Sequence, residues 1–221
     1  MLSHLRLLQL LSPMLPVGSY SYSQGLEWAV EQQWVSSKSD FEQWLVELIA
    51  GQLAQQDLPL LRRLFVACSE GDISKFDHWS HMSLALRDTT ELRAEERARA
   101  DAYLRILNAL PEPLDARYLN GIKTTPLAAI AWAAVQWEIE DHALLAAYAH
   151  NWLEAYTTNG VKIIPLGQSD GQALIHALIP ALCSAVDVAC AIDDDAVGFS
   201  SPAIALASCG HESQYTRLYR S

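Results

Sequence analysis

The chain lacks paired cysteine motifs and long hydrophobic runs. None of its four cysteines belongs to a C-x-x-C pair, so neither a zinc knuckle nor a thioredoxin-type motif is present. The longest uninterrupted apolar run, residues 126–135, is far shorter than the roughly 20 residues that a membrane-spanning helix needs. No charged segment followed by an apolar core and a cleavage site opens the chain, so we expect no secretory signal. These absences predict a cytoplasmic protein with free thiols.

Basic residues are also scarce. Fifteen lysines and arginines face 26 acidic residues, and the formal net charge is −11 at pH 7. Such a balance disfavours a nucleic acid or an anionic membrane as partner. The 221 residues include only ten glycines and nine prolines, and 51% are hydrophobic. This composition predicts one ordered domain with a sizeable core.

The apolar residues recur at helical spacing along most of the chain. After Pro59, which suits the first turn of a helix, the residues Leu60, Leu61 and Leu64 mark one face. Residues 127–137 are apolar on nearly every side, as in a central core helix. No segment shows the alternation of β-branched and polar residues that strands require. We therefore predict an all-α fold in which residues 1–221 form a single domain of roughly eight to ten helices.

An irregular stretch near the N-terminus stands out. Residues 12–28 read SPMLPVGSYSYSQGLEW, and their two prolines and two glycines exclude a regular helix until about Gly25. The five consecutive hydroxyl side chains of residues 19–23 favour local hydrogen bonds with the backbone. The stretch is either a connector between helices or a recognition surface. We favour the surface, because Tyr20 and Tyr22 flank small residues that let another chain approach closely.

Residues 87–105 carry five arginines and five acidic residues. Glu95 with Arg99, and Asp101 with Arg105, are favourable i,i+4 pairs on a helix. The pattern is typical of a solvated helix with salt bridges on its surface.

A catalytic alternative comes from residues 167–171, which read G-Q-S-D-G and match the G-x-S-x-G elbow of serine hydrolases. Ser169 would be the nucleophile, and the acids Asp193–Asp195 and then His211 follow in the order that α/β-hydrolases use. The elbow, however, needs a preceding strand within a parallel sheet, and the sequence predicts none. A serine hydrolase is therefore the second hypothesis.

Four blocks of the sequence resemble a known family. They are SPMLPVGSYSYSQGLEWAV at residues 12–30, RDTTELRAEE at 87–96, KIIPLGQSDGQ at 162–172 and HESQYTRLYRS at 211–221. Together, and in this order, they resemble the UreF family of urease accessory proteins. The last block departs mildly, with Tyr219 in place of the usual phenylalanine and Thr216 where serine is common.

The resemblance implies an all-helical assembly protein that is not an enzyme and holds no bound cofactor. It implies binding to UreD (UreH in some lineages) and recruitment of the GTPase UreG, whose GTP cycle is coupled to nickel delivery into urease apoprotein in the cytoplasm. It also implies a homodimer within that complex, without nucleic acid or membrane. The lysine and glutamines of the third block are associated in the family with regulation of the GTPase.

Two sets of candidate partner-binding residues follow from the resemblance. The set expected to contact UreD consists of His211, Glu212, Gln214, Tyr215, Arg217, Leu218, Tyr219, Arg220 and Ser221. The set expected to contact or regulate UreG consists of Pro16, Gly18, Tyr20, Ser21, Glu27, Lys162, Gln168, Gly171 and Gln172.

The tail, residues 210–221, carries a pattern of its own. Tyr215, Leu218 and Tyr219 are spaced i, i+3 and i+4, which suits a helical turn docking into a partner's groove. So short a helix is unstable alone, so we expect a mobile C-terminal tail whose removal leaves the melting temperature unchanged. The alternative is a tail that folds back onto the core. Near its start, Cys209 and His211 are a candidate pair of transient nickel ligands.

Overall fold

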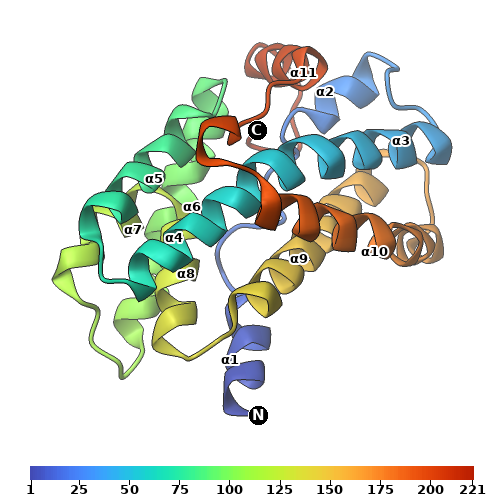
Figure 1. Cartoon of the computed structure of the whole chain (residues 1–221). Coiled ribbons are helices and arrows are strands. Elements are labelled where there is room, and N and C mark those ends of the chain that lie inside the picture. Colours follow the sequence, from blue (N-terminus) through green and yellow to red (C-terminus); the bar gives the residue numbers. More distant parts are fainter.

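The structure is a computed structural model that describes residues 1–221, and it contains helices but no strand (Figure 1). The all-α prediction is therefore confirmed. The α-helices are α1 (Leu2–Leu10), α2 (Leu26–Glu31), α3 (Lys38–Leu48), α4 (Leu58–Ser69), α5 (Ile73–Ala85), α6 (Thr90–Ala109), α7 (Leu119–Thr124), α8 (Pro126–Gln136), α9 (Asp141–Ile163), α10 (Gln168–Ala191) and α11 (Pro202–Glu212). Two short 3₁₀ turns, η2 (Ala116–Tyr118) and η3 (Asp194–Ala196), and a π-helical segment, η1 (Ile49–Asp57), complete the fold.

One helix runs without a break from Lys38 to Ser69, because η1 joins α3 directly to α4. It starts at a capping box in which Ser37 accepts the backbone N–H of Asp40 and the Asp40 carboxylate accepts that of Ser37. Pro59 does not begin a separate helix, as the sequence predicts, but lies at the junction of η1 and α4. Counting this run once gives ten helical segments, within the predicted range.

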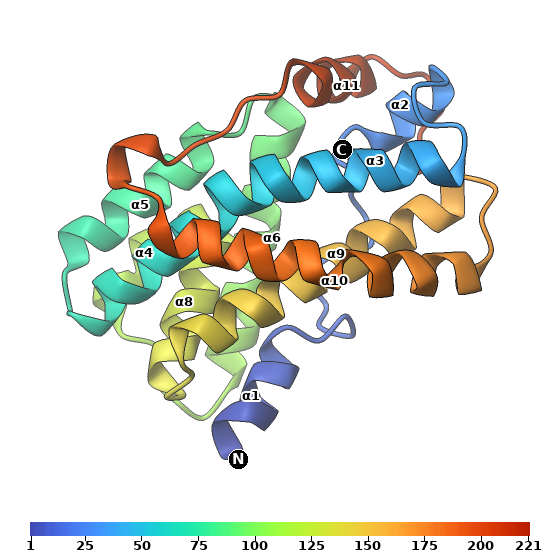
Figure 2. The same cartoon turned by 45° about the vertical axis from the view of Figure 1, so that its right-hand side comes forward.

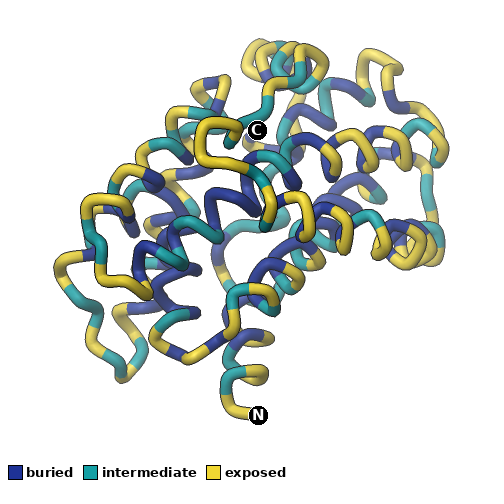
Figure 3. The backbone as a smooth tube through the Cα atoms, in the orientation of Figure 1, coloured by how far each residue is buried: buried dark blue, intermediate teal, exposed yellow.

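The core lies between two groups of helices. Helix α8 is buried along nearly its whole length and packs against α4, α6 and α7, which confirms the predicted core helix. On the other side, α9 and α10 pack against each other, and α10 crosses η1 (Figure 2). Buried residues line the inward faces of all these helices (Figure 3). This arrangement fixes the ends of α6, α9 and α10, which carry the candidate site.

Helix α10 alone is long and apolar enough to cross a membrane by length and composition. The sequence interpretation missed it because polar residues interrupt its apolar run. In the protein its inner face packs against α9, η1 and α4, with Leu174, Leu178 and Leu182 buried there. A core helix passes the same test of length and composition, so α10 is no more than weak evidence for a membrane span.

The two ends of the chain differ in placement. Helix α1 extends from the body in Figures 1 and 2, whereas the last residue lies beside α2, under α11. Helix α11 packs against α2 and α6. After α11 the chain forms no further helix and turns back along the N-terminal stretch.

Candidate partner-binding surface

The N-terminal stretch is a loop that ends where the sequence predicts. Gly25 is the N-cap of α2 and has a φ of 85°, a left-handed conformation that glycine adopts without strain. It also touches the backbone of α11, since a Cβ on Gly25 would lie 2.8 Å from the amide nitrogen of Ser208. The glycine therefore permits both the turn into α2 and the close approach of α11.

Asn159, on α9, holds the loop and the tail together. Its side-chain NH₂ group donates to the main-chain carbonyl oxygen of Tyr22 at 2.8 Å. Its main-chain carbonyl oxygen accepts a hydrogen bond from the Tyr219 hydroxyl at 3.0 Å. The residue is buried. The sequence interpretation did not identify Asn159. The residue lies just before the third block, which begins at Lys162, and belongs to no motif.

The tail is anchored at its end, which corrects the expectation of a mobile tail. The main-chain oxygen of Ser221 accepts the backbone N–H groups of Ser23 and Gln24 at 2.6 and 2.9 Å. Its hydroxyl donates to Glu95 at 2.9 Å, and the N–H of Arg220 donates to the carbonyl of Ser21 at 2.9 Å. Ser221 is only 1% exposed. Non-local bonds of this kind replace the local helical turn that the spacing predicts.

Glu27 makes a contact within the protein that the sequence does not predict. Its carboxylate accepts the backbone N–H groups of Leu218 and Tyr219 at 2.6 and 2.9 Å. The carboxylate therefore fixes the tail against α2. Tyr219 is buried, and burial, reinforced by the charge of Glu27, raises the pKa of its hydroxyl to about 12.

The residues expected to contact UreD divide into two groups. His211, Tyr219 and Ser221 are buried and hold the tail in place. Tyr215 is fully exposed, and Leu218 is 66% exposed. The other exposed members are Glu212, Arg217 and Arg220, and Gln214 is half-buried. We call residues 18–24 and 215–221 the loop–tail surface, because backbone hydrogen bonds join the two segments.

The candidate nickel pair is split between surface and interior. Cys209 is exposed, whereas His211 is fully buried. The His211 ring nitrogens lie 2.6 Å from a carboxylate oxygen of Glu91 and 3.3 Å from one of Glu27. Both nitrogens are therefore engaged within the protein, and no cluster of three or more metal-ligating side chains surrounds them. The histidine links α11 to α2 and α6.

The structure brings four residues of the predicted UreG set into one pocket. Lys162, near the end of α9, and Gln168, Gly171 and Gln172, at the start of α10, line a cavity of about 310 Å³. The Lys162 ammonium lies 5.3 Å from the centre of the Tyr20 ring, which connects this pocket to the loop. Pro16 and Gly18 are on the loop but do not line the pocket.

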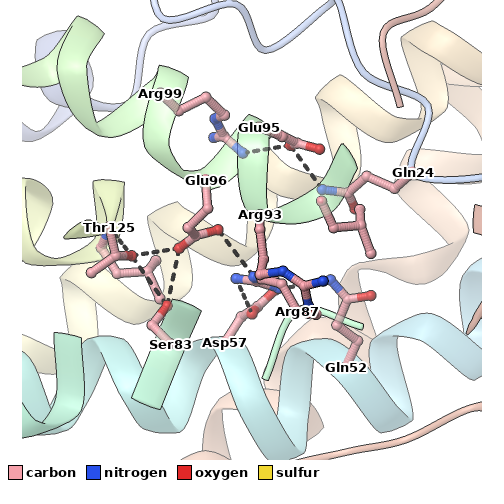
Figure 4. A network of polar contacts seen from close by, with 12 residues as sticks. Gln24, Gln52, Asp57, Ser83, Arg87, Arg93, Glu95, Glu96, Arg99 and Thr125 are labelled. Carbon is pink, nitrogen blue, oxygen red and sulfur yellow. Dashed lines mark hydrogen bonds and ion pairs between the residues drawn. The ribbon is translucent and has the colours of Figure 1, made fainter. Parts of the chain in front are cut away.

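The charged segment of residues 87–105, which includes the first part of α6, is not simply solvated, and this corrects the sequence interpretation. Arg87 is buried and donates to Asp57 at 2.9 Å and to Glu96 at 3.0 Å (Figure 4). Glu96 also accepts hydrogen bonds from Ser83 and Thr125. Because ions leave water only when they are paired and hydrogen-bonded, this cluster fixes the α4, α5 and α6 regions to one another.

The neighbouring residue connects that helix to the chain end. Glu95 is buried and accepts hydrogen bonds from Gln24, Arg99 and Ser221. The predicted Glu95–Arg99 pair is thus present at 3.3 Å, whereas Asp101 and Arg105 form no ion pair. Burial raises the pKa of Glu95, with Arg99 opposing the shift. Through Glu95, the second sequence block is therefore hydrogen-bonded to both the loop and the tail.

The serine-hydrolase hypothesis is wrong. Ser169 lies in the first turn of α10 and Asp193 lies just beyond its last residue, so a 24-residue helix about 36 Å long separates them. His211 is buried between two glutamates on other helices. No strand supports a nucleophile elbow.

The fold and this surface define an all-helical protein whose two chain ends are joined in one surface. Comparison with known proteins gives the family: the family model UreF matches residues 35–179. The chain is 43% identical to the urease accessory protein UreF of Alcanivorax borkumensis, over 98% of this chain and 97% of that protein. It is 44% identical to UreF of Pseudomonas putida (100% and 98%) and 41% identical to UreF of Escherichia coli O157:H7 (98% and 97%). The chain belongs to the UreF family of urease accessory proteins, and it is not an enzyme.

Proposed function

We propose that this protein is a cytoplasmic assembly factor that binds UreD (UreH) and recruits the GTPase UreG. In this role it couples the GTP cycle of UreG to nickel delivery into urease apoprotein, as a homodimer within the complex. The observation that carries the proposal is the loop–tail surface, which presents Tyr215, Leu218 and Arg220 to solvent on a tail fixed by buried bonds.

The chemistry of this surface favours a protein partner. Tyrosine and arginine are common at the energetic centres of interfaces, and an exposed leucine beside them adds apolar area. Because Ser221 and Tyr219 already order the tail, a partner gains contact without the full entropy cost of ordering a free segment. We assign UreD to the tail of this surface, residues 215–221.

The second surface belongs to UreG in this proposal. It is the pocket lined by Lys162, Gln168 and Gln172, and it meets the loop at Tyr20. Its position beside the loop–tail surface lets one protein hold both partners at once.

Co-expression with the urease subunits and the other accessory proteins tests the proposal. Leu218→Ala removes an exposed side chain of the tail, and we expect it to reduce co-purification of UreD at least tenfold. Leu8→Ala is the matched control, since Leu8 is 69% exposed on α1, away from the tail. If both variants retain UreD equally, the loop–tail surface is not its binding site.

A role for Cys209 and His211 in passing nickel stays a proposal, and the structure changes its test. His211→Ala would disturb the tail, because the imidazole contacts Glu27 and Glu91. Cys209→Ala leaves those contacts in place, because Cys209 is exposed. We expect lower urease activation at limiting nickel with the complex intact; unchanged activation would exclude the cysteine.

A further inference from the structure

The α9–α10 pocket has the features of a recognition site rather than a packing defect. It is open to solvent and its volume of about 310 Å³ suits a side chain from another protein. Gly171 lies where the two helices approach, and a Cβ there would come within 3.0 Å of Val161. The wall there consists of the Gly171 backbone packed against the side chains of Val161 and Thr157, so a larger residue at position 171 would crowd it.

One cation at this pocket has no acidic partner. Lys162 is exposed and forms no ion pair, although its ammonium lies over the Tyr20 ring. The nearest acidic residue of α10, Asp170, is already bound to Lys38 at 2.8 Å and accepts the N–H of Gly167. On α9 itself, Glu154 forms no ion pair with Lys162; burial and the charge of Glu154 raise the pKa of Tyr20. The pocket therefore retains an uncompensated positive charge.

Hydrogen-bond donors accompany this charge. The pocket lies at the N-terminus of α10, a helix of 24 residues, where unpaired N–H groups and the helix dipole favour an anion. The amide side chains of Gln168 and Gln172 line it. Thr157, which is 1% exposed and also lines it, has a hydroxyl without a hydrogen-bond partner. Charge and donors together match a carboxylate.

We propose that the α9–α10 pocket receives an aspartate or glutamate side chain of a partner protein, with Lys162 as its counter-charge. The inference rests on the proposed function only for the identity of that partner, UreG. In this contact, one acidic side chain of the partner enters the pocket and forms an ion pair with the Lys162 ammonium.

A charge-swap experiment tests this pairing in the full complex of this protein with UreD and UreG. Lys162→Glu should lower the affinity for UreG at least tenfold, and Lys162→Gln should lower it less. Lys123→Glu is the matched control, because Lys123 is also exposed and forms no ion pair, but lies on α7. Both lysines are on the surface, so circular dichroism should show wild-type melting temperatures for all three variants.

Rescue identifies the partner's residue. Each surface aspartate and glutamate of UreG is changed to lysine, and one of these changes should restore binding to the Lys162→Glu variant. Wild-type affinity of Lys162→Glu, or no rescue by any single change, would overturn the inference while leaving the proposed function standing if the wild type binds both partners. Failure of the wild type to bind UreG would instead overturn the proposed function.

A ligand titration separates a carboxylate from a phosphate. Amide resonances of Gln168 and Gln172 should shift with sodium acetate in the wild type and not in Lys162→Gln. Shifts with inorganic phosphate alone would make the pocket a phosphate site, and the inference would be wrong.

Discussion

The main-chain oxygen of Ser221 accepts the backbone N–H of Ser23 at 2.6 Å and its hydroxyl at 2.8 Å, although 198 residues separate the two. The first and last sequence blocks of the family resemblance are therefore one structural unit. We therefore expect a change in either segment to disturb the other.

The two tyrosines of the tail should behave differently. Tyr219→Ala removes a buried ring and its hydrogen bond to Asn159, and we expect a loss of about 2–4 kcal/mol in the free energy of unfolding. Tyr215 is fully exposed, so Tyr215→Ala should change that free energy by less than about 0.5 kcal/mol. Urea denaturation measures both. Equal stabilities would mean that the tail is not anchored.

The Tyr219 hydroxyl should also make stability depend on alkaline pH. Its pKa in the folded protein is about 12, against an ordinary value of 10.0. The stability it contributes is therefore complete below the ordinary value and is lost as pH rises through the folded value. At neutral pH, Tyr219→Phe should cost about 1 kcal/mol. Between about pH 10 and about pH 12 the melting temperatures of the two proteins should converge; a constant gap would contradict the assignment.

Two glycines with positive φ offer a matched test of the contact between α2 and α11. Gly71→Ala meets no atom within 4 Å, so only backbone strain of about 1–2 kcal/mol should result. Gly25→Ala adds a clash with the backbone of Ala207 and Ser208, which should cost a further 1–3 kcal/mol or so. Denaturant unfolding of both variants checks the difference. Equal losses of stability would show that α11 moves away from position 25 without a measurable cost in free energy.

The buried ion cluster should dominate the stability of α6. Arg87→Ala leaves Asp57 and Glu96 buried without their cation, and we expect a loss of about 3–5 kcal/mol. Arg97→Ala, on the exposed face of the same helix and without an ion pair, should lie within about 0.5 kcal/mol of the wild type. A small effect of Arg87→Ala would show that water reaches the two carboxylates.

Helix positions could be predicted well where a local rule decides them. Gly25 ends the loop and α2 starts at the next residue, because two prolines and two glycines prevent helix before it. Residues 126–136 form the core helix α8, because an apolar surface on every side must be buried. Pro59 misled the prediction, since η1 carries the helix through the junction with α4.

The candidate site could be predicted only in part. The resemblance selected Lys162, Gln168, Gly171 and Gln172, and the structure places all four at one pocket. It also selected Glu27 and His211, but not their task of holding the tail. Asn159 and Asp57 were missed, because each acts on residues far away in the sequence.

The sequence by itself determined the helices, the apolar core and the family, since these depend on local spacing and on motifs within one segment. Only the tertiary structure decided the conformation of the tail and the burial of the charged residues at α6. The tail's i, i+3, i+4 spacing favours a helical turn, yet Ser23, Glu27 and Asn159 capture its polar groups instead. Whether a charge is solvated or buried depends on which helix packs over it, and that is a property of contacts between distant residues.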